Sequence, residues 1–316
     1  MEYDKNICDW TVGDMVEGFY LLKAAASRTT AGGKSYLSGT VSDRSGSADF
    51  VRWDYSGPID GGDAGKVIKL RGQVTQYKGN LQLTVSQLRR PTEADRYDIS
   101  RLLPTAPIDV DARLSEIRDL IASMDDADYR AVAETMLERH LQAFRTIPAA
   151  KFFHHEFLSG LLMHTSNMLR LANFLAGLYS EIVDRDLLLT GTLLHDFAKE
   201  REFSFSELGL VTGYSLAGNL LGHLVMGAQE VAEVAAELGL NEEKSLLLQH
   251  LLLSHHGVPE FGAAVLPMCP EAELLSRIDM IDSRMEIYAE TMTTMKPGEV
   301  SERVHALDDR KIYKHS

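Results

Sequence analysis

The chain of 316 residues is long enough for two domains, and its composition, 45% hydrophobic and 25% charged, is that of an ordinary globular protein. No stretch approaches the ~20 uninterrupted apolar residues of a membrane span, and the first residues lack the basic and then apolar layout of a signal peptide. These features argue against a membrane protein and predict a cytoplasmic location. Cys8 and Cys269 lie far apart without a CxxC motif, which argues against a disulfide framework or a cysteine zinc site.

The net charge of −14 at neutral pH is unevenly distributed along the chain. Residues 23–96 carry 12 Lys and Arg against 7 Asp and Glu, whereas residues 97–316 carry 19 against 34. Binding of a nucleic acid depends on Lys and Arg side chains that neutralise phosphates, so a uniformly acidic protein would be a poor candidate for it. The basic first part keeps nucleic-acid binding open, and the acidity of the second part is typical of solvated helix surfaces.

The first part of the chain is predicted to form short β-strands separated by glycine-rich turns. Glycine and asparagine at the breaks can take positive φ, as tight turns require. Five strands within about 80 residues indicate a small barrel, and the OB-fold is a five-stranded barrel that often holds single-stranded nucleic acid. The predicted strands are residues 15–26, 34–43, 48–54, 66–77 and 80–88.

The hydrophobic period changes after residue 111. Residues 91–111 carry three of the nine prolines and show no clear period, whereas apolar residues beyond them recur at helical spacing. We place the N-cap of the second helix at Asp128. The predicted helices cover residues 114–124, 132–144, 157–179, 184–199, 218–238, 242–256 and 270–295. We therefore expect a multidomain α+β protein, with an OB-fold domain at 1–95, a linker at 96–111 and an all-α domain at 112–316.

Histidines and aspartates interrupt the apolar helical stretches of the second part. The clearest case is LLLTGTLLHDFAK, residues 187–199, in which His195, Asp196 and Lys199 close an apolar helix. Burying an unpaired carboxylate costs several kcal/mol, so this group predicts a cation at the end of the helix. Polar residues of the same kind interrupt or end other helical stretches at His164, His223, His255, His256 and Asp279.

Imidazole nitrogens and carboxylate oxygens without thiolates suit Mn, Fe, Co, Ni or Zn. Two such cations would be able to stabilise the attacking and leaving oxygens of a phosphodiester and to activate water. Lys199 could hold a phosphate oxygen of the substrate as a point charge. For His223 or His256 alone, a structural role bonded to a backbone carbonyl is an equal alternative. We expect a first metal position at His164, His195, Asp196 and Asp279, and a second at His223, His255 and His256, with the choice between the last two left open.

At the level of motifs, this part resembles the HD superfamily of metal-dependent phosphohydrolases. His164, the pair His195-Asp196 and Asp279 match the H…HD…D order of that superfamily within residues 150–290. The resemblance implies hydrolysis of a phosphate ester without specifying the substrate, because the superfamily includes nucleotidases, cyclic-nucleotide phosphodiesterases and nucleases. One departure is Met163, where members of the family often have an acidic residue.

Together with the barrel, the motifs resemble the YhaM-type 3′-to-5′ exoribonucleases. The segments that carry the resemblance are GFYLLK, GKSYLSGTVSDRSG and FVRWD, followed by GLLMHT, LLHDFAKE, LLGH, LSHHG and EAELLSRIDMID. The resemblance implies hydrolysis of single-stranded RNA, or also single-stranded DNA, to nucleoside monophosphates. It implies one or two ions, with Mn favoured over Fe, Co, Ni, Zn or Mg, and catalytic roles for Asp196 and Lys199. Apart from the resemblance, we expect His154 and His155 to be structural or solvated, with a place at the substrate entrance as the alternative.

Other functions are left open by the residues. The same metal site could act on free nucleotides or cyclic dinucleotides, and a degenerate site would leave a non-catalytic nucleic-acid-binding regulator. The barrel could serve as an oligomerisation module, so a homo-oligomer is a further expectation. If the barrel binds RNA, its aromatic residues would stack on bases and its basic residues would contact phosphates, although the aromatics could equally be core. The residues expected to bind RNA are Tyr36, Arg52, Trp53, Lys69, Arg71, Tyr77 and Lys78.

Overall fold

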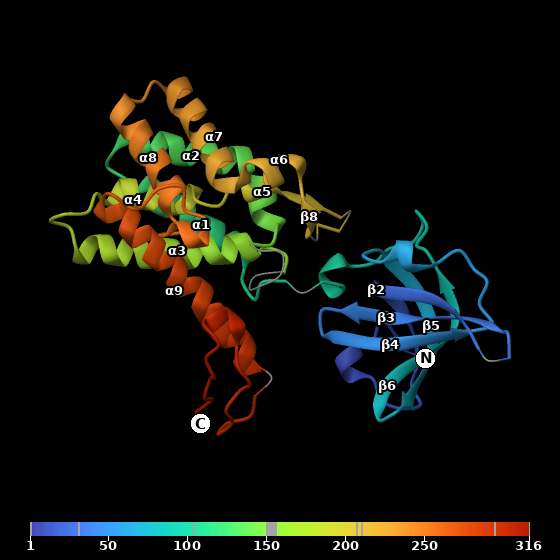
Figure 1. Cartoon of the computed structure of the whole chain (residues 1–316). Helices are drawn as coiled ribbons and strands as arrows, with labels where there is room; N and C mark the ends of the chain where they lie inside the picture. The colour runs from blue at the N-terminus through green and yellow to red at the C-terminus, as the bar shows by residue number, and fades with distance from the viewer. Residues whose placement is uncertain are drawn as a thin grey trace. The chain divides into compact units, whose positions relative to one another are not determined.

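The computed structural model describes residues 2–30, 32–103, 105–149, 157–206, 208–209, 211–293 and 295–315. The chain divides into two compact units, residues 1–105 with 206–210, and residues 106–205 with 211–316. The boundary between Thr105 and Ala106 falls inside the segment expected as a linker. The assignment of residues 96–111 as a linker stays a prediction. Each unit has its own hydrophobic core. Figure 1 shows that the first unit consists mainly of strands and the second mainly of helices.

The first unit is a closed five-stranded barrel, as the sequence predicted. Its strands are β2 (Met15–Thr29), β3 (Ser35–Asp43), β4 (Gly46–Trp53), β5 (Val67–Tyr77) and β6 (Asn80–Arg89), preceded by the short β1 (Glu2–Tyr3). Strand β2 pairs antiparallel with both β3 and β5, which closes the barrel. Strand β4 pairs antiparallel with β3 and parallel with β6, and β6 pairs with β5. The order β2-β3-β4-β6-β5 and back to β2 is that of an OB-fold.

The barrel core is built from alternate residues of the strands. Leu37 and Val41 of β3, Phe50 of β4 and Ile68 of β5 are fully buried, because every second residue of a strand faces the interior. The opposite face carries exposed side chains at some positions, such as Trp53 of β4, although Val51 of β4 and Val67 of β5 are buried beside the core residues.

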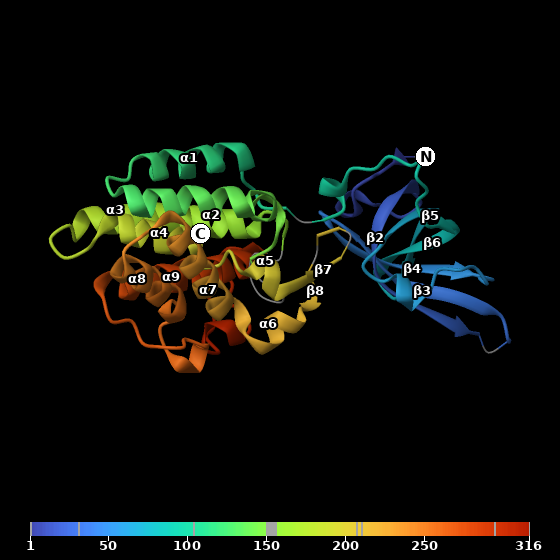
Figure 2. The ribbon, with the colours of Figure 1, turned by 90° about the horizontal axis from the view of Figure 1, so that it is seen from above.

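The second unit is a bundle of helices arranged around α4. Its helices are α1 (Val110–Ala122), α2 (Ala127–Thr146), α3 (Gly160–Leu178), α4 (Arg185–Leu194), α5 (Lys199–Glu202), α6 (Leu216–Leu220), α7 (Gly222–Leu238), α8 (Glu242–Ser254) and α9 (Pro270–Thr293). Helix α4 contacts α2, α3, α8 and α9. Figure 2 shows α1, α2 and α3 side by side, with α7, α8 and α9 across from them. No helix in the described ranges combines the length and apolar character needed to cross a membrane.

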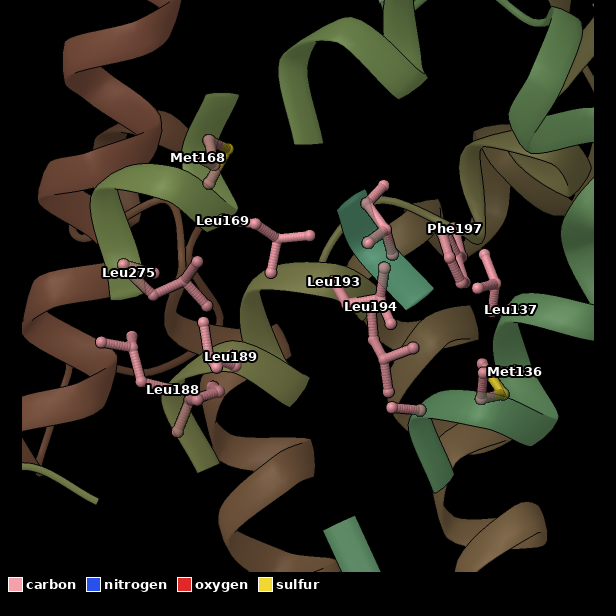
Figure 3. Close-up of a cluster of buried hydrophobic side chains, with 14 of the residues drawn as sticks. Met136, Leu137, Met168, Leu169, Leu188, Leu189, Leu193, Leu194, Phe197 and Leu275 are labelled. Carbon is pink, nitrogen blue, oxygen red and sulfur yellow. The ribbon is translucent and has the colours of Figure 1, made fainter. Parts of the chain in front are cut away.

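Helix α4 is apolar on all sides because other helices surround it. Leu188, Leu189, Leu193 and Leu194 are each at most 1% exposed. Figure 3 shows these leucines among side chains of α2, α3 and α9, including Leu275. This packing fixes the position of α4, and with it the positions of His195 and Asp196, which follow Leu194.

Helix α2 begins two residues earlier than the sequence suggested. Asp126, and not Asp128, is its N-cap, because the Asp126 carboxylate accepts hydrogen bonds from the backbone nitrogens of Asp128 and Tyr129. Asp128 lies in the first turn, where a negative charge interacts favourably with the free N–H groups of the helix. Either aspartate fits the cap pattern of the sequence, and only the backbone geometry distinguishes them.

Two predicted helices are interrupted in the structure. The helix expected at 184–199 ends at Leu194, and the chain turns through His195 and Asp196 before the short α5. The helix expected at 218–238 is broken into α6 and α7 at Gly222, which has a φ of 73°. Both interruptions fall next to residues of the candidate site.

The helical unit also contains a two-stranded hairpin that the sequence pattern did not predict. Strand β7 (Phe203–Phe205) pairs antiparallel with β8 (Val211–Tyr214). These strands are too short to give a recognisable alternation in the sequence. Residues 203–221, which include this hairpin and α6 and connect α5 to α7, are here called the excursion.

Candidate metal centre and nucleic-acid face

The candidate metal centre is formed by side chains from several helices of the second unit. His164 comes from α3, His223 from the start of α7 and Asp279 from α9, whereas the remaining residues come directly after the ends of α4 and α8. Potential ligand atoms form two groups, in each of which they lie within 4.8 Å of one another. His164 Nε2 also lies 3.3 Å from Asp279 Oδ1. The groups are His164, His195 and Asp196, here called group 1, and His223, His255 and His256, here called group 2.

Asp196 of group 1 also faces group 2, and it uses a different carboxylate oxygen toward the histidines of each group. Its Oδ2 is 3.2 Å from His195 Nε2 and 4.0 Å from His164 Nε2. Its Oδ1 is 3.4 Å from His223 Nε2 and 3.9 Å from His255 Nε2. Asp196 would therefore be within reach of a cation held by the histidines of either group.

His195 and His255 are held in the same way at the ends of two helices. His195 is the C-cap residue of α4, and His255 is the C-cap residue of α8. Each Nδ1 donates a hydrogen bond of 2.8 Å to the carbonyl three residues earlier, on Thr192 and Leu252. Because Nδ1 donates to a carbonyl, Nε2 is the ring nitrogen that each histidine presents to the centre.

His164 and His223 are held by carboxylates instead. His164 Nδ1 donates to Asp282 Oδ2 at 2.7 Å, and His223 Nδ1 donates to Glu202 Oε1 at 2.9 Å. Both carboxylates are buried. A hydrogen bond from the outer ring nitrogen to a carboxylate is the usual arrangement of a metal-binding histidine.

Several polar atoms at the centre are buried without a hydrogen-bond partner. Each buried polar group left unsatisfied costs about 1–3 kcal/mol, so a concentration of them marks a place where a bound ion would provide the missing interactions. Nitrogen and oxygen donors without sulfur suit Mn, Fe, Co, Ni or Zn. The residues therefore fit a divalent cation. The unsatisfied atoms are His195 Nε2, Asp196 Oδ1, His223 Nε2, His255 Nε2 and His256 Nδ1.

Lys199 neutralises Asp196 inside the protein. Its Nζ donates to Asp196 Oδ2 at 2.7 Å and to the carbonyl of Ala149 at 2.8 Å. Burial alone would raise the pKa of Asp196, but Lys199 and His195 hold that pKa well below its ordinary value. Burial likewise acts to lower the pKa of Lys199, and Asp196 outweighs it so that the pKa is raised. Both groups are therefore ionised at neutral pH.

The histidines of the centre differ in protonation. Burial, together with neighbouring His195 and His256, holds the pKa of His255 well below its ordinary value, so its ring is neutral. Burial also acts to lower the pKa of His164, but Asp279 and Asp282 raise it to about 9. A cation bound between His164 and Asp279 would take the place of that proton, because metal binding requires the neutral ring.

Glu202 and Asp282 are the residues of the centre that sequence reasoning missed. Asp282 comes three residues after Asp279 on α9, so the two share a helix face, and this spacing was a usable signal. No spacing of this kind marked Glu202, because its partner His223 is 21 residues away in the sequence, after the excursion. His154 and His155, considered for the substrate entrance, lie outside the described residues.

Two of the barrel residues expected to contact RNA lie together on the outer face. Tyr36 on β3 and Trp53 on β4 are paired in register, and their ring centroids are 5.0 Å apart. Arg28 on β2 is the register partner of Tyr36, so the three side chains form one row across three strands. Trp53 is 48% exposed. Arg28 was not singled out from the sequence.

The other expected barrel residues lie elsewhere on the wall. Arg52 points to the opposite face from Trp53, because successive side chains alternate and its register partner Leu37 is buried. Lys69 Nζ lies 3.3 Å from Glu17 Oε1, so the glutamate neutralises the charge of the lysine. Arg71 is the register partner of the same glutamate. Tyr77 and Lys78 lie at the turn between β5 and β6, with the Lys78 ammonium 5.5 Å from the ring centroid.

Comparisons with known proteins match both the helical unit and nearly the whole chain. The family model of the HD domain matches residues 161–284. The chain is 38% identical over 312 residues to the 3′-5′ exoribonuclease YhaM of Listeria innocua serovar 6a, with 98% of both chains covered. The chain belongs to the YhaM family of 3′-5′ exoribonucleases. The YhaM of Listeria monocytogenes serotype 4b (strain F2365) has the same identity and coverage. The resemblance seen in the sequence motifs is thereby confirmed.

Solved structures similar to this YhaM family member match its barrel part. An OB domain from Thermoplasma acidophilum is 15% identical with a TM-score of 0.25, covering 31% of this chain and 93% of that one. The second OB-fold domain of replication protein A from Methanococcus maripaludis is 13% identical with a TM-score of 0.22, covering 31% of this chain and all of its own.

Proposed function

We propose that this member of the YhaM family hydrolyses single-stranded RNA from its 3′ end and releases nucleoside monophosphates. The observation that carries the proposal is the cluster of buried, unsatisfied ligand atoms around Asp196, together with relatives named as 3′-5′ exoribonucleases over 98% of the chain. Without a bound ion these atoms would only lower the free energy of unfolding, so their presence is best explained by a metal-dependent hydrolytic site.

Group 1 with Asp279 would hold one divalent cation, group 2 would hold a second, and Asp196 would contact both. The chemistry that divalent cations supply at such a site is activation of water at neutral pH and neutralisation of charge on phosphorus oxygens. We propose Mn²⁺ as the working ion, since it accepts both the imidazole and the carboxylate ligands present here.

The protein's own contribution is to keep the ligands ready and to place the phosphate. Lys199 holds Asp196 in its ionised form through the 2.7 Å contact at Oδ2. An ammonium has three N–H donors, and two of them bond Asp196 and Ala149. The third is available for a non-bridging oxygen of the scissile phosphate, which is the catalytic role that we propose for Lys199.

The row Arg28, Tyr36 and Trp53 is the surface that we propose for single-stranded RNA on the barrel. Aromatic rings stack on any base, and the guanidinium of Arg28 would contact the phosphate beside them. These contacts do not use the 2′-hydroxyl, so the same row would also accept single-stranded DNA. Tyr77 and Lys78 are candidates for a further contact at the exposed β5–β6 turn, and Arg52, Lys69 and Arg71 remain weaker ones.

The test is digestion of a 5′-labelled single-stranded RNA with Mn²⁺, with Mg²⁺ and with EDTA, resolved on a sequencing gel. The wild-type protein is expected to give a descending ladder with Mn²⁺ and no products with EDTA. Asp196→Asn should abolish hydrolysis and leave RNA binding nearly unchanged, while Asp119→Asn, at an exposed position of α1, should behave as wild type. RNA that stays intact in every metal lane would contradict the proposal, and free nucleotides and cyclic dinucleotides would then be the substrates to try.

A further inference from the structure

Two buried carboxylates stand directly behind histidines of the metal centre, and the proposed function assigns them no part. Glu202 lies behind His223 in group 2, and Asp282 lies behind His164 in group 1. We infer that Glu202 and Asp282 are positioning residues that set the metal affinity of the two groups separately. This inference rests on the proposed metal-dependent function and adds a division of labour within its site.

Glu202 fixes His223 at two points. Its Oε1 accepts one hydrogen bond from the backbone nitrogen of His223, at 3.0 Å, and another from Nδ1 of the same residue, at 2.9 Å. The first contributes to where α7 begins, and the second orients the ring with Nε2 toward Asp196 Oδ1. The buried carboxylate therefore helps to set both the position and the orientation of one ligand.

Residues of the excursion contact the backbone carbonyl of Glu202. The backbone nitrogen of Ser215 donates to the carbonyl of Glu202 at 2.8 Å. A Cβ on Gly218 would lie 2.1 Å from that same carbonyl oxygen, so α6 packs against Glu202 as closely as a glycine allows. Glu202 thus has little room to move, as expected of a residue that orients another.

Asp282 acts from α9 on group 1. Its Oδ2 accepts from His164 Nδ1 at 2.7 Å, while Asp279, one turn earlier, places Oδ1 3.3 Å from Nε2 of the same ring. One helix therefore contacts both nitrogens of His164. The remaining imidazoles that face Asp196, His195 and His255, are oriented by backbone carbonyls and should be insensitive to changes at either carboxylate.

The consequence for metal binding is local. A carboxylate behind an imidazole increases its basicity as a ligand, and loss of such a partner typically weakens metal affinity by about 10–100-fold. Because His164 and His223 belong to different groups, Glu202→Gln should weaken one class of metal site and Asp282→Asn the other.

The experiment is a calorimetric titration of the full-length, metal-free protein with Mn²⁺ alone. We expect two classes of site in the wild type, of which His164→Ala removes one and His223→Ala the other. Glu202→Gln should weaken the His223 class by about 10–100-fold and change the His164 class less than about twofold, with the reverse for Asp282→Asn. Glu233→Gln on α7 and Glu290→Gln on α9, two exposed carboxylates, are the matched controls.

A second readout separates positioning from a general effect on the fold. In ¹⁵N spectra of the imidazoles of the metal-free protein, His223 should carry its proton on Nδ1, and Glu202→Ala should shift it toward a mixture of tautomers. Glu202→Asp keeps the charge and should preserve more of the Mn²⁺ affinity than Glu202→Ala. Equal affinity in wild type, Glu202→Gln and Asp282→Asn, or weakening of the same class by both, would overturn the inference. A wild-type protein that binds no Mn²⁺ would instead overturn the proposed metal-dependent function.

Discussion

The ammonium group of Lys199 lies 2.7 Å from Oδ2 of Asp196, and the two side chains are only 17% and 4% exposed. A buried pair of this kind is costly to break, because removal of one partner leaves the other charge uncompensated. Lys199→Met should therefore destabilise the protein by about 3 kcal/mol and reduce Mn²⁺-dependent hydrolysis of RNA at least about 100-fold. Urea unfolding and initial rates would measure the two effects. Activity within twofold of wild type would show that the pair has no part in hydrolysis.

The packing of α4 on α8 gives a second prediction. A Cβ on Gly191 would lie 2.3 Å from Leu251 Cδ2 and 3.2 Å from Leu251 Cβ, so Gly191→Ala must displace this side chain of α8, one turn before His255. We expect a loss of about 1–3 kcal/mol in the free energy of unfolding, together with weaker Mn²⁺ binding. Gly177→Ala on α3 is the control, because a Cβ there meets nothing within 4 Å. The prediction fails if the two variants unfold at the same urea concentration.

The third prediction concerns pH. His140 on α2 is buried between Glu200 and Glu230, with contacts of 2.7 and 2.8 Å. Burial acts to lower its pKa, but the two carboxylates raise it to about 9. The unfolded chain has the ordinary value near 6.5, so the stabilisation by the charged ring is complete below pH 6.5 and is lost as the pH rises to 9.

This linkage amounts to about 3 kcal/mol, which urea unfolding in EDTA at pH 6 and pH 9.5 would measure. His140→Gln should be less stable than wild type at pH 6, and the difference between the two proteins should shrink toward pH 9.5. A constant difference across this range would show that His140 is not charged in the folded protein.

The aromatic row of the barrel gives a fourth prediction. Trp53→Ala should weaken binding of single-stranded RNA in EDTA by about 1–3 kcal/mol, because base stacking contributes about that much for each base. Arg28→Ala should reduce the slope of log affinity against log salt by about one, as expected for one lost phosphate contact. Phe174→Ala removes an exposed aromatic residue from α3 and serves as the control in filter binding. Unchanged binding by Trp53→Ala would assign the barrel another role.

Much of this arrangement could be predicted from the sequence, and the failures have physical reasons. Periodicity predicted the barrel and the helices of the second unit because a strand repeats every two residues and a helix every 3.6. Periodicity wrongly extended the helix at 184–199 through His195 and Asp196, because apolar residues continue past Leu194. The end of that helix depends on tertiary contacts. The order of histidines and aspartates indicated the centre before any geometry was known.

The residues that support the ligands were harder to predict. Glu202 and His223 are 21 residues apart with the excursion between them, and Asp282 and His164 are 118 apart. Nothing local links the members of these pairs, since their hydrogen bonds exist only once the helices have packed. For the same reason Arg28 gained significance only when the register of β2 and β3 placed it beside Tyr36.

The way His195 and His255 end their helices also limits how this protein can change in length. Each ring bonds the carbonyl three residues before it and faces the centre from the first position after the helix. One extra residue within α4 or α8 would rotate the C-terminal end of that helix by about 100°, since a helix turns through 3.6 residues. The imidazole would lose its hydrogen bond to the carbonyl and would no longer face the metal centre. Insertions and deletions should therefore be excluded from these two helices and tolerated in the loops, so the number of residues in α4 and α8 is itself a requirement of the site.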